Sequence, residues 1–275
     1  YIFNKAHQAL ISNKKTNDVD VDKYIKDGFF KTNVESSQFC KLISSKINMQ
    51  KINNSKTNHV FNIDQEMRHL IKEHILSNFS ETIMKLENFY KSKISIADIR
   101  ISRNFYLDNP TMKAYSNDYH SDYYTYNHFK LFINLMDIEL KNGPLHYYSK
   151  TDTKEFIKIN NYKNRSNYID NELYEKLKTN TGKIGESLVV STTECIHKAG
   201  KVEKGVFRDM MFVTFITIPE KLNKSENYLF YYEKVFPDII WGKNDEENKI
   251  LKITKPQSLI KTIKLFFKYL KNKLN

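Results

Sequence analysis

The sequence predicts a mainly β, α+β fold in which helices support a β-barrel or jelly roll. Apolar residues recur at helical spacing up to residue 90, and short segments with alternating apolar residues follow from 94 to 218. The sequence also lacks βαβ alternation and a glycine-rich phosphate loop. Barrels of this length are routinely single domains, so we expect one domain over residues 1–275, with its core at about 21–219.

The supporting helices are predicted in the first third of the chain. A short amphipathic helix over 22–27 ends at Gly28 and passes into a strand, because glycine is the usual residue at a helix C-terminus. A second helix is predicted at 35–47, and the Asn-rich segment 48–62 is predicted as a loop. Between 64 and 90 the apolar spacing fits two helices or one kinked helix.

The strands of the predicted barrel begin after Lys93. Apolar and polar residues alternate from there, and the alternation slips by one residue at Ala97-Asp98, which predicts a β-bulge or the true start of the strand. Further strands are predicted between turn-forming residues, at 113–119, 129–136, 145–148, 187–191 and 210–218.

Two segments stand apart from this core. Residues 150–182 are polar and irregular, and loops of that length are often functional, so they are predicted to form an insertion or a lid. The 220–275 segment is a C-terminal extension that ends in a basic amphipathic helix at 258–275. Such a helix either packs on its own domain or on a dimer partner, or docks peripherally on an anionic membrane surface.

The composition indicates the cellular compartment and the class of binding partner. No apolar run approaches the roughly 20 residues that a membrane-spanning helix needs. Two cysteines, Cys40 and Cys195, are too few for a disulfide framework, so we expect a cytoplasmic protein. We also expect a monomer or homodimer, which could associate peripherally with the inner membrane face through 258–275. The net charge of +12 would suit nucleic acid, but the lysines are scattered and no nucleic-acid-binding signature occurs. A basic nucleic-acid-binding protein is therefore the less favoured alternative.

A candidate metal site centres on His120-Ser121-Asp122. On an extended strand, side chains two apart point to the same face, so His120 and Asp122 can reach one ion. His197 supplies a second imidazole, and two His with one carboxylate form the facial site of non-haem Fe(II) oxygenases. Arg208 is one of only five arginines, and its planar fork suits a carboxylate. The alternative is a chance His-x-Asp pair exposed to solvent.

Four short motifs set this site in a family pattern. In chain order they are Tyr24-Ile25-Lys26-Asp27-Gly28-Phe29, Asn142-Gly143-Pro144-Leu145, Gly185-Glu186 and His197-Lys198-Ala199-Gly200. With these motifs, the chain from about Tyr24 to Ile218 resembles the phytanoyl-CoA dioxygenase family of Fe(II)/2-oxoglutarate-dependent oxygenases. It departs from that family where Tyr148-Ser149-Lys150-Thr151 replaces the usual Pro-Gly-Ser-His.

The resemblance implies a double-stranded β-helix core, the jelly roll of cupin-like proteins. It implies that His120, Asp122 and His197 bind Fe(II) and that Arg208 holds the C5 carboxylate of 2-oxoglutarate. An aromatic residue, Phe132, would pack against this cosubstrate. From the earlier strand, Ser102 or Asn104 would contact it.

The implied reaction uses O2 to convert 2-oxoglutarate to succinate and CO2 while an unactivated C–H bond of a small molecule is hydroxylated. Relatives that halogenate replace the carboxylate ligand with a small residue, so Asp122 favours hydroxylation. A catalytically silent jelly-roll binding module is the alternative. An extra histidine, His146, is predicted to line the pocket or the surface rather than bind metal.

The substrate is predicted less closely than the chemistry. The surplus of lysines favours a polar or anionic small molecule. Aromatic side chains beside the metal motif suit a sugar or glycan precursor, or they are there because aromatic residues favour strands. The predicted pocket residues are Tyr115, Tyr123, Tyr124 and Tyr147.

Overall fold

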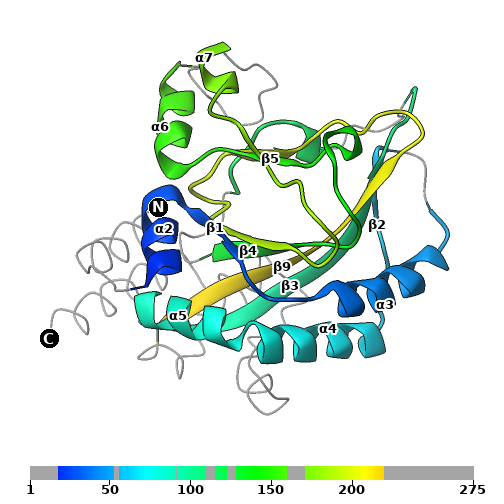
Figure 1. The fold of residues 1–275 in the computed structure, drawn as a ribbon, viewed down its shortest axis with the longest axis horizontal. Coiled ribbons are helices and arrows are strands. Elements are labelled where there is room, and N and C mark those ends of the chain that lie inside the picture. Colours follow the sequence, from blue (N-terminus) through cyan, green and yellow to red (C-terminus); the bar gives the residue numbers. More distant parts are fainter. Residues whose placement is uncertain are drawn as a thin grey trace, which may run out of the picture.

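The computed structural model describes residues 18–52, 56–90, 92–109, 115–122, 128–159 and 171–219 (Figure 1). The predicted extension at 220–275, with its helix at 258–275, lies outside these residues. In the described ranges, no helix combines the length and apolar character that crossing a membrane requires.

Two antiparallel sheets form the centre of the molecule. The larger sheet has the strand order β1 (Phe29–Thr32), β7 (Ser187–Val190), β4 (His128–Asn134), β9 (Phe207–Pro219), β3 (Ser92–Phe105) and β2 (Asn58–Val60). The smaller sheet has the order β6 (Lys178–Thr179), β5 (Leu145–Tyr147) and β8 (His197–Ala199). This is the mixed α+β arrangement with antiparallel sheets that the sequence predicts.

Helices cover one face of the larger sheet. They are α2 (Val19–Asp27), α3 (Ser37–Asn48), α4 (Gln65–Asn78) and α5 (Ser80–Tyr90), and Figure 1 shows α3, α4 and α5 along that face. Between them and the sheet lies the main apolar core, in which Ile43, Ile71 and Ile75 of the helices pack with Leu131 and Val213 of the strands. Two further helices, α6 (Lys150–Ile159) and α7 (Asn171–Tyr174), lie on the opposite side of the molecule (Figure 1).

The strand period of two divides the larger sheet into a core face and a site face. On β4, Leu131 and Ile133 join the helix-side core, whereas Lys130 and Phe132 line a cavity on the other face. On β9, Arg208 lines the same cavity. The cavity therefore lies between the larger sheet and the segment that carries β8.

Most predicted elements are confirmed. The first helix ends at Gly28, whose φ of +84° lies in the left-handed region that glycine adopts without strain. The segment 64–90 forms two helices, and the register of β3 against β9 shifts between Ile96 and Asp98, where the sequence predicts a bulge.

Other predictions are wrong in detail. Instead of a strand through 113–119, residues 115–117 form the 3-10 helix η1 (Tyr115–Asn117), and the predicted loop at 48–62 contains β2. The insertion at 150–182 begins with α6 and ends with β6, so it is not irregular there, and β8 is absent from the prediction. These missed strands have only two or three residues, too few to show periodicity, and their partner strands define them.

Candidate metal centre

The His-x-Asp segment is held against β8 by backbone hydrogen bonds. The amide of His120 donates to the carbonyl of His197 (3.0 Å), and the amide of His197 donates back to His120 (2.9 Å). The amide of Asp122 donates to the carbonyl of Thr192 (2.9 Å). The segment is an isolated bridge rather than part of a continuous strand. Three side chains nevertheless meet there, because ligand atoms of His120, Asp122 and His197 all lie within 4.8 Å of one another.

Both imidazoles have their protons placed by the backbone. Nδ1 of His120 lies 2.7 Å from the carbonyl oxygen of Asp118, and Nδ1 of His197 lies 3.0 Å from that of Cys195. A carbonyl can only accept, so each Nδ1 carries the hydrogen, and in the neutral ring the lone pair is on Nε2. Nε2 of His120 is the nitrogen that faces Asp122, at 4.0 Å from Oδ1. This is the tautomer that metal-binding histidines use.

The charge states also suit a metal. Burial lowers the pKa of His197 to about 3, and the ring of His120 acts in the same direction, so the imidazole is neutral at neutral pH. Burial alone would raise the pKa of Asp122, but the ammonium of Lys130 and the ring of His197 outweigh it, and the pKa of this carboxyl is lowered. The neutral imidazole of His197 and the carboxylate of Asp122, together with the imidazole of His120, are the ligand types of a facial Fe(II) site.

Lys130 is a neighbour of the triad that the sequence analysis missed. Its Nζ lies 2.7 Å from Oδ2 of Asp122, and both side chains are nearly buried. Oδ1 is therefore the carboxylate oxygen that faces His120. A signal for Lys130 was present in the sequence, since it lies two residues before Phe132 and must share its face of the strand.

Arg208 lies in the same cavity as the two histidines. Its side chain is buried, and Nε and Nη1 have no hydrogen-bond partner among the described residues. The next residue, Asp209, points to the other face, where Arg103 binds its carboxylate with two hydrogen bonds. Burial lowers the pKa of Arg208 to about 10, so the guanidinium stays charged. A buried cation with unpaired N–H groups fits a carboxylate ligand.

The other predicted cosubstrate residues reach this cavity as well. Phe132, Ser102 and Asn104 line it, and its volume is about 180 Å³. Tyr147 instead packs edge-on against Phe29 in the apolar cluster below, with ring centroids 4.9 Å apart, and does not line the cavity. The side chain of Tyr115, together with Tyr123 and Tyr124, lies outside the described part of the chain.

His146 is not part of the triad. Its Nδ1 lies 3.4 Å from the hydroxyl of Tyr119, and burial lowers its pKa to about 4, with Lys198 and Arg208 adding to the effect. The imidazole is therefore neutral and lies beside the cavity rather than at the metal position.

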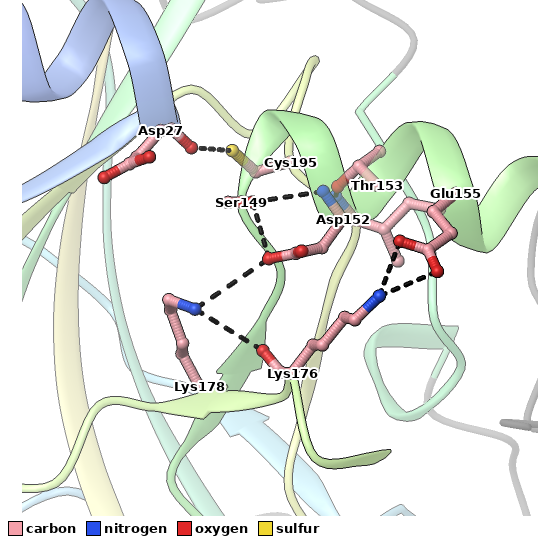
Figure 2. Close-up of polar contacts among 9 residues, drawn as sticks. Asp27, Ser149, Asp152, Thr153, Glu155, Lys176, Lys178 and Cys195 are labelled. Carbon is pink, nitrogen blue, oxygen red and sulfur yellow. Dashed lines mark hydrogen bonds and ion pairs between the residues drawn. The ribbon is translucent and has the colours of Figure 1, made fainter. Parts of the chain in front are cut away.

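The start of the insertion braces the distal histidine. Thr153 of α6 accepts a hydrogen bond from the buried amide of Ile196, the residue before His197 (2.9 Å). Figure 2 shows how α6 is fixed in place: Asp152 contacts Ser149 and Lys178, and Glu155 binds Lys176 at 2.7 Å. These contacts make the first part of the insertion a fixed support for β8.

Comparison with known proteins gives a likeness of fold. No family model and no curated protein matches the sequence. Among solved structures, EctD from S. alaskensis, with 2-oxoglutarate and 5-hydroxyectoine, matches 75% of this chain and 79% of its own at 12% identity, with a TM-score of 0.50. The two chains share the same fold over these residues.

Two further solved structures have similar coverage. SnoN, a non-heme alpha-ketoglutarate-dependent epimerase from nogalamycin biosynthesis, is 9% identical over 77% of this chain and 83% of its own, with a TM-score of 0.49. HygX from Streptomyces hygroscopicus, with nickel, 2-oxoglutarate and hygromycin B bound, is 11% identical over 73% and 87%, with a TM-score of 0.49. At such identities the likeness concerns the fold, and the reaction must be inferred from this chain's own residues.

Proposed function

We propose that the protein is an Fe(II)- and 2-oxoglutarate-dependent oxygenase that hydroxylates a C–H bond of a polar or anionic small molecule, sugars and glycan precursors included. One observation carries the proposal. Two imidazoles, each with its Nδ1 hydrogen directed to a backbone carbonyl, and one ionised carboxylate converge within 4.8 Å. Both imidazoles line a cavity that also holds a buried arginine, of which two nitrogen atoms have no hydrogen-bond partner among the described residues. Metal and dicarboxylate thus have complementary positions in one cavity.

Each residue of the site has a distinct part in this proposal. His120, Asp122 and His197 would hold Fe(II), leaving its other positions open. Arg208 would bind the C5 carboxylate of 2-oxoglutarate and orient the opposite end of the molecule toward the metal. When bound, these two groups supply the oxidising chemistry, in which O2 is consumed, 2-oxoglutarate becomes succinate and CO2, and the substrate gains one hydroxyl.

One wall of the metal cavity is apolar. Phe132, Met210 and Phe212 contribute to one wall of the cavity, and their strands are packed on the other face by the helix-side core. Arg208 itself is buried, so its bond to a carboxylate would be stronger than the same bond in water, because the effective dielectric constant is lower there.

Anaerobic titration of the full chain with Fe(II) and 2-oxoglutarate tests the proposal directly. We expect a metal-to-ligand charge-transfer absorption band, followed by succinate after exposure to oxygen. His197→Ala and Asp122→Ala should lose the band, whereas His146→Ala, a histidine beside the same cavity but outside the triad, should keep it.

Three outcomes would contradict parts of this proposal. If the wild type gives neither the band nor succinate with a broad set of candidate substrates, it is not an oxygenase of this class. A band without succinate would favour the catalytically silent binding module. If His146→Ala loses the band and His197→Ala keeps it, the distal ligand has been wrongly assigned.

A further inference from the structure

A second cavity, of about 340 Å³, adjoins the metal cavity. Asn104 and Ala199 line both cavities, so the two lie side by side. Ala199 is two residues beyond His197 on β8, which places the junction next to the metal ligands. A small molecule in the second cavity can therefore extend a reacting group toward the triad.

The charges that line this cavity are positive. Lys198 and Lys201 line it, and among the described lining residues there is no Asp or Glu. The ammonium of Lys198 lies 4.4 Å from the ring centroid of Tyr119, which fixes its position.

Two cations that line the metal cavity, Lys130 and Arg100, form ion pairs within the protein, in contrast to these two lysines. Lys130 binds Asp122 at 2.7 Å, and Arg100 binds Asp98 at 2.7 Å. Within the described parts of the chain, no carboxylate lies within ion-pair distance of Lys198 or Lys201. The second cavity thus holds the unpaired positive charge that remains once Arg208 has a carboxylate ligand.

Neutral hydrogen-bond donors line the same cavity. Asn104 is 4% exposed, and its Oδ1 accepts a bond from Asn58 Nδ2 (3.2 Å), which orients the amide and leaves its own Nδ2 without a partner among the described residues. Thr57 Oγ1 accepts from Asn117 Nδ2 (3.0 Å), so its hydroxyl hydrogen can be donated elsewhere. Two ammonium groups, one amide and one hydroxyl are donors for an anion with several oxygens.

We propose that this cavity is a phosphate subsite, and that the substrate is a phosphorylated small molecule whose reacting carbon lies in the metal cavity. This inference rests on the proposed oxygenase function. A phosphate monoester carries about −1.5 to −2 charges and three acceptor oxygens, which matches two lysines and two neutral donors better than a carboxylate does. Arg208 stays with 2-oxoglutarate, so the two anions occupy separate places.

Phenyl phosphate is a suitable probe, because it is a simple phosphate monoester that chelates metals weakly. We would titrate it into the full chain and follow binding by ³¹P NMR, first without metal and then with Mn(II) and saturating 2-oxoglutarate. Binding should persist with 2-oxoglutarate present. Bound Mn(II), confirmed by its EPR signal, should speed ³¹P relaxation because the phosphate lies in the neighbouring cavity.

Charge-matched variants locate the subsite. Lys201→Glu, at an exposed position that tolerates substitution, and Lys198→Met should each weaken phenyl phosphate binding by about tenfold or more. Lys204→Glu changes the net charge equally, but Lys204 lies outside the cavity lining and pairs with Asp108, so binding should change less than about twofold.

The outcomes separate this inference from the proposed function. Three results would overturn the phosphate subsite. In the first, 2-oxoglutarate abolishes phenyl phosphate binding. In the others, Lys201→Glu and Lys198→Met both leave binding unchanged, or bound Mn(II) does not speed ³¹P relaxation. If Lys201→Glu weakens phenyl phosphate binding but the protein does not bind metal with 2-oxoglutarate, the phosphate subsite stands and the oxygenase function is contradicted.

Discussion

The two ends of the metal cavity differ in how their buried charged and polar groups are paired. At the metal end, formed by His120, Asp122 and His197, each group has a partner within the protein: a carbonyl for each Nδ1 and Lys130 for the carboxylate. At the arginine end, Nε and Nη1 of Arg208 have no partner among the described residues. The metal end is preorganised by internal bonds, whereas the arginine end depends on its ligand.

This difference has energetic consequences. A buried polar group without a hydrogen bond costs about 1–3 kcal/mol, and more when it is charged. The arginine end therefore destabilises the cofactor-free protein and gains when a carboxylate binds. At the metal end, removal of one partner leaves another charge unpaired. Substitutions at the two ends should thus change stability in opposite directions.

The largest effect is expected for Arg208→Met. Loss of a bidentate, desolvated partner should weaken 2-oxoglutarate binding roughly 100- to 1,000-fold. At the same time the cofactor-free protein should become more stable, by about 1–2 kcal/mol, because a buried uncompensated charge is replaced by an apolar side chain. Anaerobic 2-oxoglutarate titration and urea unfolding measure the two changes. Arg100→Met, on the same face but paired with Asp98, is the control and should show neither change.

Lys130→Met should destabilise the metal-free protein, whereas Arg208→Met should stabilise it. It leaves the Asp122 carboxylate buried without its partner, so the metal-free protein should lose about 3 kcal/mol of stability. A divalent ion then supplies the missing positive charge, so Mn(II) should raise the melting temperature of Lys130→Met more than that of the wild type. Lys183→Met breaks an exposed pair with Asp137 and should cost less than about 1 kcal/mol. Equal losses in the two variants would contradict the internal pairing at the metal end.

The pH dependence of stability distinguishes the two ends further. Besides His197, a second buried histidine lies near the metal end: His128 is fully buried at the start of β4, two residues before Lys130. Burial lowers the pKa values of His128 and His197 to about 3, whereas histidines of the unfolded chain have a pKa of about 6.5. As pH falls below about 6.5 the unfolded state takes up protons that the folded state does not, so stability falls. Each group contributes about 1.4 kcal/mol per pH unit until pH approaches its folded pKa.

Urea unfolding of the metal-free protein between pH 7 and pH 4.5 measures this slope. His128→Leu should reduce this slope by about 1.4 kcal/mol per pH unit, the contribution of one histidine. Arg208→Met should leave it unchanged, because the guanidinium is ionised over that whole range. If Arg208→Met changes the slope of unfolding free energy against pH as much as His128→Leu does, the buried charges of the two ends are not independent.

The sequence predicts most of the helical layer and the identity of the triad. The two helices within 64–90 and the helix end at Gly28 could be predicted because they depend on residues close together in the chain. The triad could be predicted because its chemistry requires particular residue types, and His120, Asp122 and His197 supply them. The strand phase slip at Ala97 likewise depends only on neighbouring residues.

The remaining features depend on contacts that are distant in the chain. The strand β8 has three residues and exists because it pairs with β5 and His120. The spacing of two places Lys130 on the same strand face as Phe132, but nothing in the sequence shows that Asp122 folds back onto it. Tyr147 was assigned to the pocket by its position in the chain, but its ring packs against that of Phe29. Tertiary contacts, not local preference, decided each of these.

The smallest effect is expected where the insertion supports the metal end. Thr153→Val removes the acceptor of the buried Ile196 amide while keeping the shape of the side chain, so unfolding free energy should fall by about 1–2 kcal/mol. Because Ile196 precedes His197, Mn(II) affinity should fall by a few-fold, whereas 2-oxoglutarate contacts at Arg208 stay intact. Thr151→Val, exposed on the same helix, is the matched control and should change neither quantity. If Thr153→Val binds Mn(II) as the wild type does while losing stability, then the insertion supports the fold alone, and preorganisation of the metal end is confined to the His120–His197 bridge and Lys130.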